Sequence, residues 1–141
     1  MNKSGIIVTF FQVADDMQKK DRIVQTSSEY FEKKELILIK VPHLKALEFV
    51  DLLLWKYPYE SFLPHCCEQN PTSDFIKIVQ KITPSTTASA IFNLCQEPIE
   101  NLNNSIKKIY ELEDTYSITK NQSAQIRYKA YKNKGFNIIA I

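Results

Sequence analysis

Two continuous apolar runs enclose one amphipathic stretch in the first forty residues, and this order constrains the fold more than any other feature. Residues 6–11 read Ile-Ile-Val-Thr-Phe-Phe, and residues 36–39 read Leu-Ile-Leu-Ile. β-Branched and aromatic runs of this length indicate strands that are buried on both faces. Residues 16–31 between them have apolar side chains at helical spacing. A strand, a helix and a strand in this order predict a parallel pair joined by a right-handed crossover.

The remaining chain continues the alternation of helices and strands. A second helix is expected from Pro42 to about Trp55; nearly all of it is apolar, so it should pack on the sheet and against something more. A last helix is expected from an N-cap at Ser117 to a left-handed C-cap at Gly135. Between these helices the pattern predicts strands at 75–79, 90–94 and 108–112 and a short helix at 99–106.

We therefore expect residues 1–141 to form a single three-layer α/β/α domain with a mixed, partly parallel sheet. The chain has only two glycines, Gly5 and Gly135. Neither a G-x-G-x-x-G motif nor a Walker loop is possible, so the fold is predicted to be Rossmann-like without a nucleotide-binding glycine loop. We expect no cofactor and no catalytic residues.

The three cysteines, Cys66, Cys67 and Cys95, do not make a secreted disulfide framework. The N-terminus has no signal-peptide pattern and no membrane-spanning run, so a cytoplasmic protein is expected. A metal site at His65-Cys66-Cys67 would need His43 and Cys95 as well, and adjacent cysteines rarely share one ion, so no metal is expected. A small enzyme that uses Cys66 and His65 stays an alternative, and it requires a thiol that reacts at neutral pH.

The charge of the chain is distributed unevenly. Residues 115–141 carry five cations and no carboxylate side chain, whereas the other residues hold 13 Lys and Arg against 16 Asp and Glu. A basic end on a mildly acidic body favours an acidic partner. The five cations are Lys120, Arg127, Lys129, Lys132 and Lys134.

Aromatic side chains accumulate in two places. Residues 55–65 contain one Trp, two Tyr, one Phe and two Pro, which suits a shallow aromatic pocket of the kind that binds peptides, although Trp55 at a helix end also suits core packing. Tyr128 and Tyr131 lie among the C-terminal cations. The carboxylates of Glu111, Glu113 and Asp114 alternate with apolar residues and are interpreted as a solvated strand edge.

Two blocks resemble the chi subunit of bacterial DNA polymerase III. Residues 54–65, Leu-Trp-Lys-Tyr-Pro-Tyr-Glu-Ser-Phe-Leu-Pro-His, are similar to the family's L-W-x-x-P-x-E-S-F-x-P-H stretch. Residues 127–131, Arg-Tyr-Lys-Ala-Tyr, followed by Gly-Phe-Asn at 135–137, match its R-Y-K-A-Y-x-x-x-G-F-N signature. The order and the separation of the two blocks also agree with the family.

The resemblance implies a non-catalytic subunit of the polymerase. Chi proteins pair with the psi subunit, which attaches them to the clamp loader, and they bind the acidic C-terminal tail of single-stranded DNA-binding protein. That tail ends in aspartates, an apolar dipeptide and a free carboxylate. The partner-binding residues expected here are Trp55, Pro58, Phe62 and Pro64 for an aromatic pocket, and Lys120, Arg127, Tyr128, Lys129 and Lys132 for the basic segment.

The chain departs from the family at two positions. Well-studied chi proteins have extra basic side chains one and two turns before the Arg-Tyr-Lys-Ala-Tyr block, where this chain has Gln125 and Asn121. A neutral amide cannot form a charged bidentate pair with a carboxylate. An alternative function is direct binding of single-stranded nucleic acid, with bases stacked on Tyr128 or Tyr131 and phosphates on the lysines.

Overall fold

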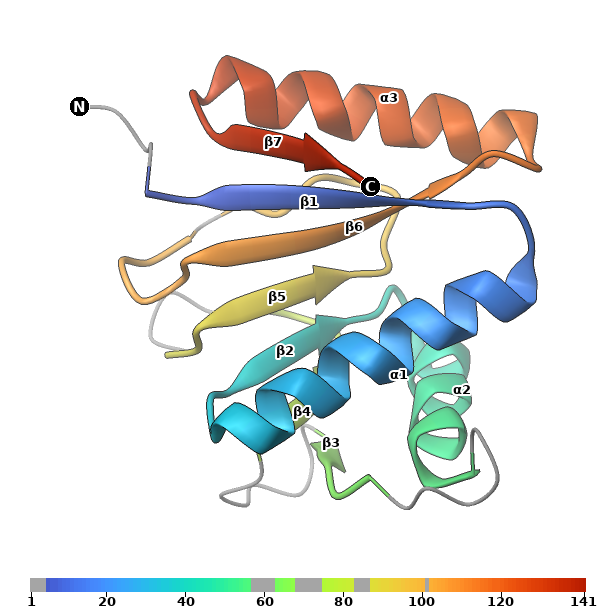
Figure 1. Ribbon diagram of the computed structural model, residues 1–141, viewed down its shortest axis with the longest axis vertical. Coiled ribbons are helices and arrows are strands. Elements are labelled where there is room, and N and C mark those ends of the chain that lie inside the picture. Colours follow the sequence, from blue (N-terminus) through green and yellow to red (C-terminus); the bar gives the residue numbers. More distant parts are fainter. Residues whose placement is uncertain (1–4, 57–62, 68–74, 83–86, 101) are drawn as a thin grey trace.

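The computed structural model describes residues 5–56, 63–67, 75–82, 87–100 and 102–141. These residues form one seven-stranded sheet and three helices (Figure 1). The strands are β1 (Ile7–Val13), β2 (Ile37–Lys40), β3 (Cys66–Cys67), β4 (Ile76–Val79), β5 (Ala90–Asn93), β6 (Lys108–Asp114) and β7 (Asn137–Ala140). The helices are α1 (Asp16–Lys33), α2 (Leu44–Lys56) and α3 (Ile118–Asn133).

The strand order across the sheet is β3-β4-β2-β5-β6-β1-β7, from the bottom to the top of Figure 1. Every pair of neighbouring strands that the structure describes is parallel, so the expected mixed sheet is wrong in that respect. β1 and β2 run parallel as predicted, but β5 and β6 lie between them. The α/β class with three layers is confirmed.

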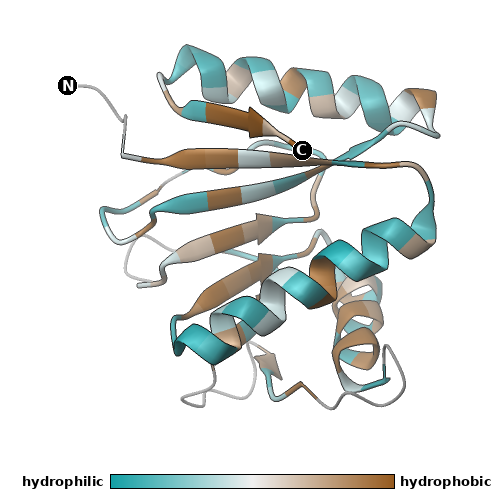
Figure 2. Cartoon of the chain, viewed as in Figure 1, coloured by the Kyte–Doolittle hydropathy of each residue, from teal (hydrophilic) through white to brown (hydrophobic). Residues whose placement is uncertain are grey.

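Helices cover both faces of the sheet. On one face, Ile23 and Tyr30 of α1 and Leu47 and Leu54 of α2 are buried in one apolar cluster. On the other face, Ala124 and Tyr131 of α3 are buried against β1, β5 and β6. Figure 2 shows α2 as largely hydrophobic, whereas α1 and α3 are mostly hydrophilic. Among the described residues, no helix combines the length and the hydropathy that a membrane span requires.

The helix ends follow local side-chain chemistry. Ser117 caps α3 as predicted, because its hydroxyl accepts a hydrogen bond from the Lys120 amide. Gly135, predicted at the end of this helix, has a φ of 81° directly after the C-cap residue Lys134. Asp15 caps α1, and Lys34 ends α1 with a left-handed φ of 59°.

One local prediction is wrong, and two strands were missed. The described residues between Ile99 and Ile106 form no helix, because the Asn103 side chain accepts hydrogen bonds from the amide and the hydroxyl of Ser105 in a turn. The edge strands β3 and β7 were not predicted. The strands expected at 75–79, 90–94 and 108–112 are confirmed, with small shifts of their ends.

The parallel arrangement places the carboxyl ends of all the described strands at one edge of the sheet. Each of the three helices begins there, because α1 follows β1, α2 follows β2 and α3 follows β6. In parallel α/β folds this edge is where ligands usually bind.

Candidate functional site

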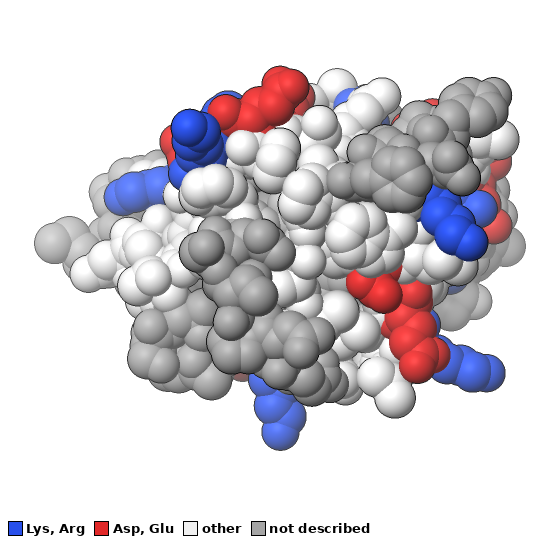
Figure 3. Space-filling model, turned by 90° about the horizontal axis from the view of Figure 1, so that it is seen from below, with Lys and Arg blue, Asp and Glu red and all other residues white. Residues whose placement is uncertain are grey.

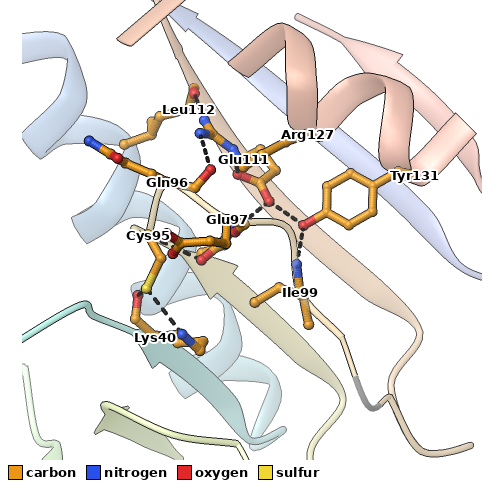
Figure 4. A network of polar contacts seen from close by, with 10 residues as sticks. Lys40, Cys95, Gln96, Glu97, Ile99, Glu111, Leu112, Arg127 and Tyr131 are labelled. Atoms are coloured by element: carbon orange, nitrogen blue, oxygen red, sulfur yellow. Dashed lines mark hydrogen bonds and ion pairs between the residues drawn. The ribbon is translucent and has the colours of Figure 1, made fainter. Parts of the chain in front are cut away.

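Arg127 is buried inside the protein, and its guanidinium is used by internal partners. Only 6% of the residue is exposed. Its Nε donates to Glu111 Oε1 at 2.8 Å, Nη1 donates to the Gln96 carbonyl at 3.2 Å, and Nη2 donates to the Leu112 carbonyl at 3.0 Å (Figure 4). Arg127 therefore ties α3 to β6 and to the chain that follows β5.

Glu111 is the counter-ion of Arg127, and it is fully buried. Its Oε2 accepts hydrogen bonds from the Tyr131 hydroxyl and from Asn93 Nδ2. Burial raises the pKa of Glu111 to about 7, although Arg127 and the two neutral donors oppose this shift. The interpretation of Glu111 as part of a solvated edge is wrong, because β6 lies between β5 and β1 rather than at the edge of the sheet.

Tyr131 belongs to the same buried network. Its hydroxyl donates to Glu111 and accepts from the Ile99 amide at 2.8 Å, and its ring stacks on Phe136. Burial and the neighbouring carboxylate raise the pKa of the Tyr131 hydroxyl. No part of Tyr131 is exposed, so a base cannot stack on it. The stacking of a base on Tyr131 is therefore excluded, and Tyr128 is the other residue that was expected to stack.

A second group of the expected residues lies on the exposed side of α3. We call residues Asn121, Gln125, Tyr128, Lys129 and Lys132 the outer α3 face, because their spacing of three or four residues places them along one side of the helix. The Tyr128 ring lies 5.9 Å from the Phe10 ring, and Lys132 Nζ lies 5.9 Å from the centre of the Tyr128 ring. Tyr128 is 37% exposed, so it is supported from behind and open in front.

The neutral positions of the outer α3 face have an acidic neighbour. Gln125 Nε2 donates to Glu113 Oε2 at 3.2 Å. The first two turns of this face therefore present amides beside a carboxylate, and the positive charge is confined to Lys129 and Lys132 near the C-terminal end of the helix.

Lys120 lies on another side of α3, at a cavity of about 530 Å³. The cavity opens at the carboxyl ends of β5 and β6, and all three helices contribute to its wall. Arg127 and Leu112 line it from the side of the buried network. The other described lining residues are Lys19, Ile23, Pro42, His43, Ala46, Phe49, Val50, Asn93, Leu94, Cys95, Gln96, Glu97, Asp114 and Ser123.

An ion pair crosses one wall of this cavity. Lys19 Nζ lies 2.7 Å from Asp114 Oδ2, and Asp114 is buried. Burial acts to lower the pKa of Lys19, but hydrogen bonds to Asp114 and Tyr116 outweigh it, so the pKa is raised. Lys19 thus stays charged beside Lys120.

Trp55 is not brought to the cations of α3. Trp55 packs its ring 4.6 Å from the ring of His65 and is 38% exposed, and it is not among the described residues that line the cavity. It lies about 18 Å further along the α2 axis than His43, at 1.5 Å per residue. Pro64 is exposed nearby, whereas Pro58 and Phe62 lie outside the described residues.

His65 supports Trp55 from inside. The His65 ring is buried, with Nδ1 donating to the Leu63 carbonyl at 2.7 Å and Nε2 lying 2.6 Å from Asp51 Oδ1. Cys66 is buried in β3. Within the described part of the chain, no group of three or more His, Cys, Asp or Glu side chains is placed to hold a metal ion.

The outward side of α2 carries large exposed apolar side chains. Leu44 is 53% exposed, Leu52 54% and Trp55 38%, whereas Phe49, which is 48% exposed, lies on the side of the helix that lines the cavity. Seen from the β3 edge of the sheet, the described surface is mainly uncharged in its middle and charged toward its rim (Figure 3). The sequence predicted that α2 packs against more than the sheet, and this side of the helix is open in the structure.

Sequence reasoning missed Glu111, Asn93 and Lys19. A carboxylate in the middle of a strand with apolar neighbours was the available signal for Glu111, since a buried acid needs a partner. Nothing in the sequence pointed to Lys19, because its role depends on the approach of α1 to the end of β6.

The comparison with protein families agrees with the two blocks found in the sequence. The family model described as DNA polymerase III chi subunit, HolC, matches residues 7–139. A search of the curated proteins found no match. The family match spans the strands and helices from β1 to β7.

Proposed function

The chain belongs to the DNA polymerase III chi subunit family, and from this membership we propose that it is a non-catalytic accessory subunit that links two proteins in DNA replication. One partner is the psi subunit of the clamp-loader complex, and the other is the acidic C-terminal tail of single-stranded DNA-binding protein. Such a subunit acts in the cytoplasm, with residues 1–141 as one domain.

We propose that the tail binds on the outer α3 face. The observation that carries this proposal is the exposed Tyr128 ring, held between Phe10 and Lys132. An aromatic ring with a rigid support is a good anchor for an apolar side chain of a peptide. Lys129 and Lys132 would supply charge for the aspartates, whereas Arg127 would hold the helix in place from inside.

Tail binding is expected to depend more on apolar contact than on charge. Asn121 and Gln125 are neutral, and Glu113 beside Gln125 repels a carboxylate. Two exposed lysines contribute about 0.2–1 kcal/mol each to an ion pair with the tail. The affinity should therefore weaken only modestly as salt rises.

We propose that psi binds the outward side of α2. This side carries the exposed apolar side chains of Leu52 and Trp55, which lie beside the exposed Lys45 and Glu48. Exposed apolar patches of this kind mark protein interfaces. The cations of the outer α3 face lie on a different helix, so the two partners would not compete.

The tail site is tested by titrating a fluorescent peptide of the organism's own single-stranded DNA-binding protein tail. Tyr128→Ala should weaken binding about tenfold, which corresponds to ~1.4 kcal/mol, and Lys132→Ala about two- to fivefold. Lys107→Ala, an exposed lysine at the amino end of β6, is the matched control and should leave binding unchanged. Equal affinity of the wild type and Tyr128→Ala would contradict the site.

The same titration with oligothymidylate tests the alternative of direct single-stranded nucleic-acid binding, which the exposed Tyr128 also suits. Binding of the oligonucleotide that is tighter than that of the tail, and that falls steeply with salt, would favour the alternative.

The psi site is tested by co-purification. Leu52→Ser together with Trp55→Ala should abolish the retention of psi, because both changes remove apolar area from the proposed interface. Ile118→Ser is the matched control, since Ile118 is an apolar residue of α3 that is 80% exposed. Retention of psi by the double variant would reject this surface.

A further inference from the structure

The cavity at the carboxyl edge of the sheet takes no part in the function proposed above. It has a volume of about 530 Å³, which lies in the range of small-molecule sites. It lies on a different side of α3 from Tyr128 and Lys132, and Lys120, Ser123 and Arg127 represent α3 in its wall. A ligand in the cavity would therefore not touch the outer α3 face.

The backbone gives this edge a positive potential. α1, α2 and α3 all begin here, and the amino end of a helix carries partial positive charge. The first turns of α2 and α3 contain no acidic residue that would neutralise it. Pro42, His43 and Ala46, at the start of α2, form part of the cavity wall. The Ala46 amide already donates to His43 Nδ1 at 3.1 Å, so the positive charge beside this wall comes from the other amides of the first turn.

Lysine side chains add to this potential instead of opposing it. Lys19 and Lys120 line the cavity, and Lys20 Nζ lies 5.9 Å from the centre of the Phe49 ring on its rim. The pKa of Asp16 nearby is lowered, first by a hydrogen bond from Tyr116 and then by these three lysines. Lys19 is paired with Asp114, and the carboxylate of Asp16 lies among these lysines, so Lys120 is the cation of the described wall that remains for an anion.

The inner wall of the cavity is apolar. Ile23 and Val50 are buried side chains of this wall, and Leu94 and Leu112 continue it. Phe49 is 48% exposed and offers an aromatic surface at the rim. An inorganic anion would leave these apolar walls in contact with water. The combination fits an anion that carries a flat or apolar body.

From this arrangement we propose that the cavity binds a small organic phosphate with an aromatic body, a nucleoside monophosphate being the simplest. The phosphate lies between Lys120 and the start of α2, where a dianion gains most from the helix and the lysines. The aromatic body lies against Phe49 and the apolar wall. The exposed carboxylate of Glu97, which also lines the cavity, suits the hydroxyl groups of a ribose.

The proposal is tested by calorimetric titration of the full chain with adenosine 5′-monophosphate, adenosine and inorganic phosphate. Saturable binding of the nucleotide is expected, with adenosine and phosphate each at least about tenfold weaker, because each lacks one half of the ligand. Lys120→Ala and Phe49→Ala should each weaken the nucleotide about tenfold, and Lys120→Arg should retain it. Lys107→Ala, at an exposed lysine that does not line the cavity, is the control and should leave nucleotide binding unchanged.

Three results would overturn the proposal: no saturable binding of the nucleotide up to about 1 mM, equal binding of adenosine, or loss of binding in Lys107→Ala. Thermal unfolding of each variant verifies that it is folded. A 5′-phosphorylated tetrathymidylate is then compared with thymidine 5′-monophosphate. Tighter binding of the tetrathymidylate would identify the ligand as the 5′ end of a strand, and equal or weaker binding would identify it as a free nucleotide. The tail peptide should bind with the same affinity in the presence of the nucleotide. Absence of nucleotide binding would therefore not argue against the tail site.

Discussion

Replacing Arg127 by Met tests the assignment of this residue to the interior. Met has a similar length and no charge, so the change removes the ion pair with Glu111 and the hydrogen bonds to the Gln96 and Leu112 carbonyls. Glu111, which is fully buried, is left without its counter-ion. Removing one partner of a buried ion pair costs about 3–5 kcal/mol in the free energy of unfolding.

The loss should depend on pH in a definite direction. Arg127 lowers the pKa of Glu111, which burial nevertheless raises to about 7. Without Arg127 this pKa rises further. At pH 6 Glu111 is therefore mostly neutral in both the wild type and the variant. The full cost therefore appears at pH 8, where Glu111 in the wild type is ionised and paired, and a smaller cost appears at pH 6.

Urea unfolding at pH 6 and pH 8, followed by circular dichroism, measures both effects. At pH 8 the midpoint should fall by about 2 M, given a typical dependence of about 1–3 kcal/mol per molar urea. Lys129→Met, at an exposed cation of the same helix, should stay within about 0.5 kcal/mol of the wild type. Arg127→Met combined with Glu111→Leu should recover part of the loss, since neither charge remains. An Arg127→Met protein as stable as the wild type at pH 8 would refute the buried pair.

Three further predictions concern stability and thiol reactivity. The pKa of Glu111 is about 7 in the folded chain and about 4.5 in the unfolded chain, so its contribution to the free energy of unfolding is full below pH 4.5 and is lost as the pH rises through 7. Relative to Glu111→Gln, the wild type should lose roughly 3 kcal/mol of stability across this window. A stability difference between the two proteins that stays constant with pH would contradict this. Lys34→Gly should raise the melting temperature, because a φ of 59° costs a side chain about 1 kcal/mol; a lower value would show that this strain is absent. Iodoacetamide should label Cys67, which is partly exposed, before unfolding, and Cys66 and Cys95, which are buried, only after it; rapid labelling of native Cys66 by peptide mapping would revive the thiol-enzyme alternative.

Much of the fold was predictable, because it depends on local patterns. The apolar runs of β1 and β2 and the cap at Ser117 specify their elements through nearby residues. β7 was missed because Asn137–Ala140 is a four-residue edge strand whose residues are mostly exposed, so burial leaves little pattern in it. The direction of the neighbouring strands depends on long-range pairing that hydropathy does not encode.

The site was less predictable, because helical spacing had to be combined with the position of the sheet. Arg127 and Tyr131 are four residues apart and lie on the buried side of α3 with Ala124, whereas Tyr128 and Lys132 lie outside. A count of charges does not distinguish the buried Arg127 from the exposed lysines of the same helix. Burial of Arg127 requires the acid at Glu111, which is distant in sequence, so the pair appears only when β6 and α3 are packed together.

We propose that this one chain holds psi and the tail on separate surfaces. It is tested most directly by titrating the fluorescent tail peptide into the purified complex of the chain with psi, and into the chain alone. We expect the same dissociation constant in both cases, with the tail, the chain and psi eluting together in size-exclusion chromatography. Displacement of psi by the peptide, or loss of peptide binding once psi is bound, would contradict it.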